Sequence, residues 1–409
     1  IAYADLHRLN LYKSDSLAIV SGLVQADFSH INNKGDIDGT IRATDLSLQN
    51  SSGTHTLEHF FLESSLAEDG KTCLVTVDSE ALKANYTGTD RLVTFLKRLA
   101  ENNLFSYLPA YFNSGNQSRT WTQDTATLDL TIHNSAFFEE LLMPGLYISP
   151  GTQLALYDFG NDSIRSVIRS ERLGYKEHNL KDLDMLAVAG KNGLHIDLEC
   201  TEMTVNPFKA DTFRLTSTTN DNRIDLDFLY NHKEGKLNSL CLNSQILFDR
   251  QTATNTPVIT AIVSSDSILF NGKTWSLHTG NLVVSDERIA LHNILLQHTG
   301  NVEIPEYLRI DGAISRTWTD TLFVELSQFD ASVFNTLLPA KYPFEFQGSF
   351  TGTGYLTDFH NDRHIAANVL GEHVYINDSL AGDIRLLSSW NPKADHLNLQ
   401  VSTTLPNGK

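Results

Sequence analysis

Histidines and carboxylates are the residues of this sequence whose types and spacing could support chemistry. His55 and His59 stand four residues apart, a spacing that would suit two zinc ligands on one face of a helix. The residues between and after them alternate between polar and apolar as in a strand, and no third ligand lies nearby. We therefore expect ordinary strand histidines and no metal site.

Acidic pairs such as Asp225 and Asp227 could be the acid and nucleophile of a glycosidase. Their spacing places them on the water-facing side of a strand, where nothing supplies the burial or charged neighbour that tunes a catalytic pKa. The glycine-rich stretch from Gly348 to Gly354 lies within a strand pattern and lacks a Lys-Ser/Thr pair or a following helix. It predicts a bulge or bend. We predict no catalytic residues, no metal and no cofactor, and hence not an enzyme.

The composition predicts a folded, soluble chain. Of its 409 residues, 41% are hydrophobic, and the formal charge is 31 − 49 = −18. No cluster of Lys and Arg is large enough to follow a phosphate backbone, so we exclude nucleic acid as a partner. Cys73, Cys200 and Cys241 are expected to be small buried hydrophobic residues, with a pairing such as Cys200 with Cys241 left open.

No stretch approaches the length of about 18 apolar residues that a membrane span requires. Because the sequence opens at Ile1 without an initiator Met, we expect a fragment of a longer protein. Any anchor or export signal would lie upstream of it.

Strict alternation of apolar and polar residues is the main pattern of the chain. It predicts a mainly β fold: a long, curled antiparallel sheet that forms a groove, with a few short amphipathic helices. Closure of the sheet on itself into a sandwich is the alternative to an open groove. The candidate groove-lining residues are Leu128, Leu130, Ile132, Ile224, Leu226, Phe228, Val324, Leu326, Val374 and Ile376.

Helical spacing occurs in three places, and we expect each helix to lie as a plug on a sheet. The first spans about 89–101, with Thr89 as a candidate N-cap. The other two precede Pro144 and Pro339. The apolar residues expected to face the sheet are Leu92, Phe95, Leu96 and Leu99 in the first helix, Phe138, Leu141 and Leu142 in the second, and Phe334, Leu337 and Leu338 in the third.

An internal duplication sets the expected domain boundaries. Ser118-Arg-Thr-Trp121 recurs as Ser315-Arg-Thr-Trp318, and the apolar positions that follow match at an offset of 196. We predict an N-terminal groove segment over 1–117, a first repeat over 118–314 and a second, truncated repeat over 315–409, all in one elongated structure. Trp121 and Trp318 are expected to pack beside a turn, with a carbohydrate-stacking platform as the alternative.

The order of several short phrases resembles the TamB branch of the AsmA-like envelope proteins, as found in Bacteroidetes. The phrases are Asn33–Leu48, Ile310–Ile314, Asp320–Leu326, Phe329–Leu338, Phe346–Gly352 and Val374–Asp383. The match extends loosely over most of the chain and is more specific from about 300 to 395.

The resemblance implies a periplasmic β-groove in a protein that is anchored in the inner membrane by a segment absent here. Such proteins are linked to phospholipid movement between membranes and to outer-membrane protein assembly, through a barrel that regions outside this fragment would contact. The implied partners are phospholipid acyl chains, and the family offers no catalytic motif to transfer. A bulky charge at Leu130, Leu226 or Leu326 would then block lipid binding. The alternative function is a structural or adhesive spacer that binds carbohydrate or protein.

Overall fold

The structure, a computed structural model, consists of two compact units. Unit 1 comprises Ile1–Pro109 and Ser114–Asp221, and unit 2 comprises Ala110–Asn113 and Asn222–Lys409. The residues that the structure describes are 2–5, 19–31, 37–50, 53–101, 104–112, 122–134, 136, 145–160, 163–206, 208–233, 237–252, 254–300, 303–315, 317, 320–330, 332, 335, 345–357, 364–391 and 396–404.

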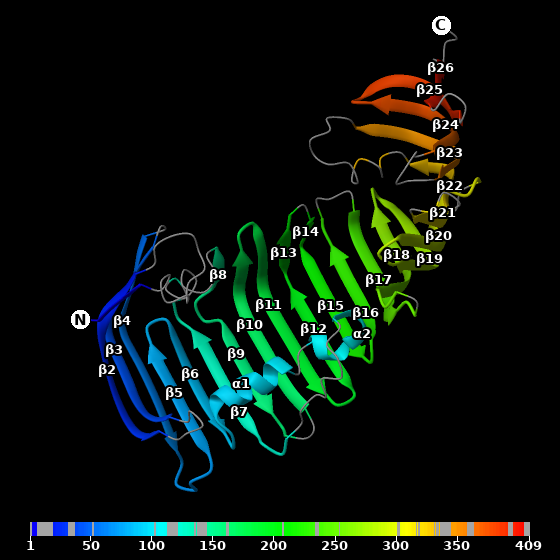
Figure 1. The fold of residues 1–409 in the computed structure, drawn as a ribbon. Helices are drawn as coiled ribbons and strands as arrows, with labels where there is room; N and C mark the ends of the chain where they lie inside the picture. The colour runs from blue at the N-terminus through cyan, green and yellow to red at the C-terminus, as the bar shows by residue number, and fades with distance from the viewer. Residues whose placement is uncertain are drawn as a thin grey trace. The chain divides into compact units, whose positions relative to one another are not determined.

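Unit 1 contains an antiparallel sheet in which most strands pair with the next strand along the chain (Figure 1). After β7 the order runs through β9, β10, β11 and β12 to β15, while β8 adds to β10 and the β13–β14 hairpin adds to β11. The strands are β1 (Ala2–Asp5), β2 (Ile19–Ile31), β3 (Ile37–Asn50), β4 (Gly53–Leu66), β5 (Cys73–Ser79), β6 (Leu82–Gly88), β7 (Ala126–Ile132), β8 (Leu146–Ile148), β9 (Gln153–Asp158), β10 (Ser163–Tyr175), β11 (His178–Gly190), β12 (Gly193–Cys200), β13 (Glu202–Val205), β14 (Phe208–Ala210) and β15 (Thr212–Asn220).

Unit 2 is a meander in which each strand pairs antiparallel with its neighbours in sequence. Its strands are β16 (Arg223–Asn231), β17 (Leu237–Arg250), β18 (Pro257–Phe270), β19 (Lys273–Val284), β20 (Arg288–His298), β21 (Tyr307–Ser315), β22 (Thr321–Asp330), β23 (Phe346–Thr357), β24 (His364–Ile376), β25 (Ser379–Asn391) and β26 (His396–Thr404). In the described residues, no pairing joins β26 back to β16, so this sheet is open. The predicted fold class, mainly β with curled antiparallel sheet and few helices, is confirmed.

Bulges curve the sheet of unit 2 at regular intervals. Asn293 in β20, Gln328 in β22 and His373 in β24 each have a positive φ, and the strand register shifts at each of them. A side-chain oxygen of the next strand accepts a hydrogen bond from the backbone N–H at each position: Asp311 Oδ2 at 2.9 Å, Thr351 Oγ1 at 3.0 Å and Asp383 Oδ1 at 2.9 Å. Bulges bend a strand and increase its twist, so these positions account for local curling.

Glycines in β23 and β21 lie at positions where the strand geometry is irregular or unusually close. The stretch around Gly348 lies in β23, and a register shift between Gln347 and Ser349 confirms the predicted bulge. Gly312 in β21 has a φ of 110°, and a Cβ there would lie 2.0 Å from the carbonyl oxygen of Thr321. The close approach of β22 to β21 therefore requires glycine at this position.

The helix predicted over 89–101 is present as α1 (Leu92–Glu101). The prediction that Thr89 caps it is wrong, because the Thr89 hydroxyl instead accepts a hydrogen bond from the Thr125 N–H at 3.0 Å. The carbonyl of Arg91 accepts the bond from Phe95 N–H at 2.9 Å, so the helix starts two residues later than Thr89 would place it. Two further short helices are η1 (Leu104–Tyr107) and α2 (Pro109–Phe112).

The expected burial of the cysteines holds for two of the three. Cys73 and Cys200 are buried, whereas Cys241 is exposed, so the prediction is wrong for Cys241. All three are free, and the pairing of Cys200 with Cys241 is not formed. Cys241 lies between Leu240 and Leu242 in the regular alternation of β17, opposite Leu229 and Ser267, so its side chain projects from the other face of the strand.

The predicted domain boundaries after 117 and 314 do not coincide with the division of the units at Asp221 and Asn222. They rest on the repeated sequence and stay a prediction. The two repeats do contain strand pairs of the same register: Leu128 lies opposite Leu156 and Leu130 opposite Leu154, as Val324 lies opposite Gly354 and Leu326 opposite Gly352.

Candidate functional site

A continuous line of apolar residues crosses the sheet of unit 1. In eleven strands, from β2 to β15, each member lies directly opposite the next, and directly opposite residues project from the same face. We call this line the apolar row. Its members are Ala26, Ile41, Leu62, Val77, Ala84, Leu130, Leu154, Ile168, Met185, Leu198 and Leu215.

The adjacent residues in the same strands form a mostly polar line on the opposite face. Its members are Asp27, Thr40, Glu63, Thr76, Asn85, Asp129, Ala155, Val167, Leu186, Asp197 and Thr216. A shift of one residue exchanges the two faces, because strand side chains alternate. The sheet therefore has one apolar and one polar face.

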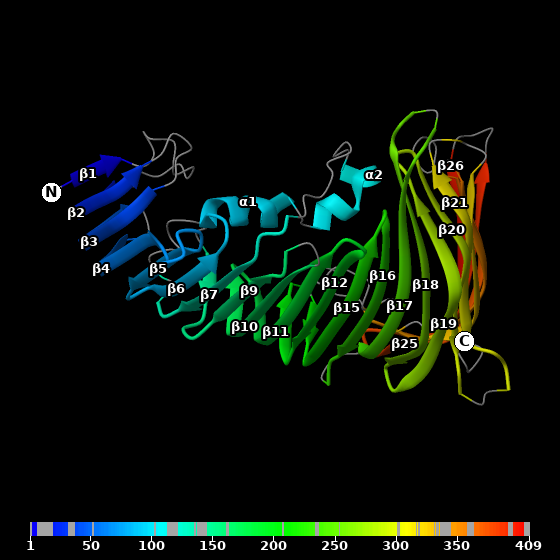
Figure 2. The same cartoon turned by 90° about the horizontal axis from the view of Figure 1, so that it is seen from below.

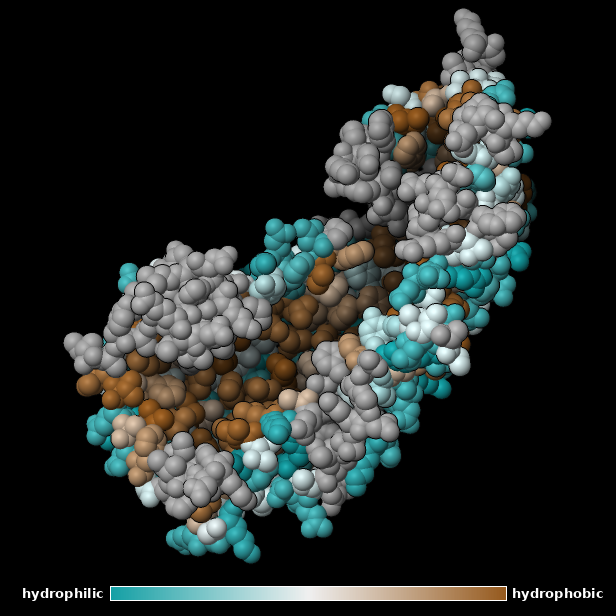
Figure 3. Space-filling view, viewed as in Figure 1, coloured by the Kyte–Doolittle hydropathy of each residue, from teal (hydrophilic) through white to brown (hydrophobic). Residues whose placement is uncertain are grey.

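The face that bears the apolar row is almost free of charge. Asp158 is the single charged residue among the positions that alternate on this face within 73–79, 82–88, 126–132, 154–158, 164–170, 183–189, 194–200 and 213–219. Ile168, Met185 and Leu198 are half-buried, neither sealed in a core nor fully in water. Figure 3 shows the corresponding hydrophobic surface lying in a hollow between hydrophilic rims.

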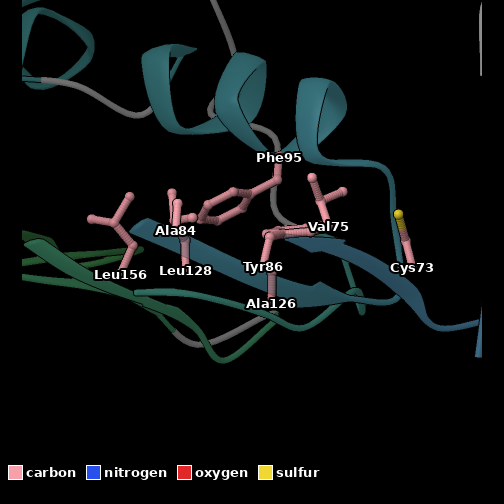
Figure 4. Packing of buried hydrophobic residues seen from close by; sticks show 8 residues of the cluster. All are labelled: Cys73, Val75, Ala84, Tyr86, Phe95, Ala126, Leu128 and Leu156. Atoms are coloured by element: carbon pink, nitrogen blue, oxygen red, sulfur yellow. The ribbon is translucent and has the colours of Figure 1, made fainter. Parts of the chain in front are cut away.

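Helix α1 packs on part of this face (Figure 2). Phe95 is fully buried and points from the helix onto Ala84, Tyr86 and Leu128 (Figure 4), with the ring centroids of Tyr86 and Phe95 5.6 Å apart. Leu92 and Leu99 pack against the same cluster, together with Val77 and the Leu130 and Leu154 pair of the apolar row.

An ionic cluster around the buried side chain of Arg98 fixes the C-terminal half of α1. One Arg98 nitrogen, Nη2, lies 2.6 Å from Asp158 Oδ2, and the other, Nη1, lies 2.9 Å from Asp90 Oδ2 and 3.5 Å from Asp124 Oδ2. Nη1 also donates a hydrogen bond to Thr122 Oγ1 at 2.6 Å. Burial raises the pKa of the Asp158 carboxyl above its ordinary value, against the lowering effect of Arg98. Arg98 thus compensates a carboxylate that the apolar face would otherwise disfavour.

Tyr86 links the cluster to the strand beneath. Its hydroxyl donates hydrogen bonds to the backbone carbonyl and the Oδ1 of Asp90, both at 2.9 Å. Burial, together with the hydrogen bond to Asp90, raises the pKa of Tyr86. The phenol is therefore a donor, and the arrangement anchors the helix without presenting a reactive group to solvent.

Unit 2 has an apolar line of its own across β20–β26. Its members, each opposite the next, are Leu296, Leu308, Leu326, Gly352, Val369, Leu386 and Val401. A neighbouring line on the same face consists of Ile294, Ile310, Val324, Gly354, Ala367, Ser388 and Leu399. Both lines are free of charged residues, as in unit 1.

The predicted groove-lining residues fall on these faces. Leu130 is a member of the apolar row, and Leu128 and Ile132 alternate with it on β7 under α1. Ile224, Leu226 and Phe228 share one face of β16 and are half-buried. The remaining four lie in unit 2: Val324 and Leu326 in its apolar lines, and Val374, which is buried, and Ile376 in β24 beyond the bulge at His373.

The predicted plugs have mixed outcomes. Leu92, Phe95 and Leu99 face the sheet, whereas Leu96 is 43% exposed, so the prediction is wrong for Leu96, which lies at the edge of the apolar stripe. Phe138, Leu141, Leu142, Phe334, Leu337 and Leu338 lie outside the described residues. The same is true of Trp121 and Trp318, on which the carbohydrate alternative rests.

Sequence reasoning missed the ionic cluster of Arg98. Its members come from α1, from the turn between β6 and α1, from the segment before β7 and from the end of β9, so no local pattern unites all of them. One signal was present: Arg98 follows Phe95 by three residues and therefore lies on the inward side of the predicted helix.

The other polar features of the described residues include a histidine–carboxylate pair and a depression in the polar face. His59 lies in β4 with its Nδ1 3.2 Å from Glu80 Oε1, and the described part of the chain contains no group of His, Cys, Asp or Glu suited to a metal ion. A depression of about 510 Å³ on the polar face is lined by Asp129, Arg165 and Arg169 among others. None of the helices in the described ranges is long and apolar enough to cross a membrane.

Comparisons of the chain with protein-family models, with curated protein sequences and with solved structures find no match.

Proposed function

We propose that the chain shelters phospholipid acyl chains on the apolar faces of its sheets. The observation that supports this proposal is the apolar row of unit 1, which crosses eleven strands on a face where Asp158 is the only charge within the ranges given above. Exposed apolar surface of this extent on a protein usually marks the binding site of a ligand or partner, and α1 covers only part of the face.

The apolar row is long and chemically uniform, which would allow an acyl chain to move along it between similar positions. Strands lie about 4.8 Å apart, so the row provides about 50 Å of similar surface along unit 1. Each methylene moved from water onto it contributes about 0.8 kcal/mol, which many neighbouring positions can supply equally. Such a surface binds acyl chains without a single dominant site, while headgroups stay in water.

The order of phrases that resembles TamB-like envelope proteins supports the biological setting of the proposal. The chain is then a segment of a protein anchored in the inner membrane, and it carries phospholipid across the periplasm in support of outer-membrane biogenesis. Contact with an outer-membrane assembly barrel belongs to other regions of that protein.

Gentle extraction from cells followed by lipid mass spectrometry tests the proposal. We expect phospholipid to accompany the purified chain at one or more molecules per protein, and an acidic soluble protein prepared in parallel to carry none. Absence of lipid from a chain whose circular dichroism shows intact β-structure would contradict the proposal and favour the structural spacer.

A further inference from the structure

Helix α1 occupies the place that an acyl chain would take over part of the apolar row. Its inward side chains Leu92, Phe95 and Leu99 cover the section formed by Val77, Ala84, Leu130 and Leu154. Farther along the row, Met185, Leu198 and Leu215 lie outside this cluster and remain half-buried. The row therefore has a section on β5–β9 that α1 covers and a section on β10–β15 that α1 does not cover, and we call these the covered and uncovered sections. Beside the uncovered section, Tyr107 of η1 packs on Ala187, Ala189, Leu194 and Ile196.

The exposed side of α1 is mixed. Val93 is 77% exposed and Leu96 is 43% exposed, beside the exposed polar residues Thr94 and Lys97. A helix that served only as a permanent lid has no need of large exposed apolar residues such as Val93. Exposed Val93 and Leu96 suit a helix that meets apolar material on both sides, with the sheet beneath it and an acyl chain beside it.

Side chains of α1 pack on the sheet, and the helix takes no part in strand pairing. The ionic cluster places the helix specifically but adds little net stability, because the desolvation of buried charges offsets most of their attraction. Removal of Arg98 alone has a different effect, because it would leave Asp90 and Asp158 buried without their cation. Arg98 therefore holds the helix in place.

We propose that α1 is a removable cover, and that the section of the apolar row beneath it, on β5–β9, is a latent acyl-chain site that opens when α1 leaves. The inference rests on the proposed function and assigns its regulation to Arg98. An incoming acyl chain replaces Leu92, Phe95 and Leu99 with chemically similar contacts, so exchange of helix for lipid costs little apolar burial.

Arg98→Met is the variant that tests the cover. We expect hydrogen exchange in the α1 peptide to rise about 100-fold, since an unpaired buried charge costs about that factor or more. A fatty acid with a diazirine on its chain is expected to label peptides 73–88 and 126–158 several-fold more in this variant than in the wild type. Labelling of 163–219 stays unchanged.

A triple variant, Arg98→Met with Asp90→Asn and Asp158→Asn, is the matched control. It removes the cation together with the two closest carboxylates, and the asparagine oxygens still accept the hydrogen bonds from Tyr86 and Gly160. Exchange and labelling are expected to return towards wild-type values. If Arg98→Met fails to fold, Phe95→Ala serves as the second releasing variant with the same readouts.

The outcomes separate the inference from the proposed function. Release of α1 without added labelling of 73–88 and 126–158 would overturn the inference alone, provided that 163–219 is labelled. Equal labelling of the covered and uncovered sections in the wild type would overturn it as well. If no peptide of the apolar row is labelled in any variant, the proposed function fails and the inference fails with it.

Discussion

Replacement of Ile168 by glutamate is expected to weaken acyl-chain binding to unit 1 at least about tenfold. Ile168 lies in the uncovered section of the apolar row, opposite Leu154 on one side and Met185 on the other. A carboxylate there must be protonated or stripped of water when an acyl chain covers it, which costs several kcal/mol, and about 1.4 kcal/mol already corresponds to tenfold. Titration with a fluorescent fatty acid measures the loss.

Val167→Glu is the control for this substitution. Val167 precedes Ile168 in the same strand, is similarly half-buried and projects from the polar face, near Arg165 and Arg169. Its carboxylate would stay in water beside two cations. We expect unchanged affinity, and equal weakening by the two variants would show that β10 is damaged rather than that a binding face is blocked.

Replacement of Phe95 by alanine is expected to lower the free energy that holds α1 on the sheet by about 3–5 kcal/mol. Phe95 is fully buried and fills the space above Ala84, Tyr86 and Leu128. The lost contacts and the remaining cavity both contribute to this cost. Native-state hydrogen exchange of the α1 amides measures it as faster exchange by a factor of about 100 or more.

Leu96→Ala, one residue further along α1, separates packing from helix propensity. Leu96 is 43% exposed, so its truncation removes little buried surface, and alanine keeps the helix. The expected change is below about 1 kcal/mol. A Leu96→Ala effect as large as that of Phe95→Ala would mean that the two sides of α1 are not distinct.

The faces of the sheets could be predicted from the sequence because alternation with a period of two is visible in single strands. Leu130 and Leu326, chosen by that criterion, both lie in apolar lines. The continuity of those lines could not be predicted. It depends on the register between strands, which turns and bulges such as that at Gln328 set through contacts distant in sequence.

The way in which α1 covers the apolar face was harder to predict than the presence of the apolar face. Helical spacing identified α1, but the pattern of four apolar residues included Leu96, which lies at the boundary of the stripe. The ionic cluster that fixes the helix joins Arg98 to Asp158, sixty residues away in sequence. Periodicity within a window carries no information on such a pair.

The duplication illustrates a further limit. Leu154 and Leu156 of the first repeat take positions that Gly352 and Gly354 take in the second, opposite equivalent residues of β7 and β22. The sequence match between the repeats covers the preceding strands but does not show this replacement of leucine by glycine. A glycine within a strand pattern predicts only a bulge or bend. The register shows that each of the two apolar lines of unit 2 lacks a side chain at one position, Gly352 in one line and Gly354 in the other.

The most direct measurement of the central claim places a photoreactive phenylalanine at Leu198 and, in a separate variant, at Asp197. The two residues are adjacent in β12 and project from the apolar and the polar face respectively. After irradiation in cells, we expect phospholipid adducts at position 198 and none at position 197. Adducts at neither position, or equal adducts at both, would contradict the account.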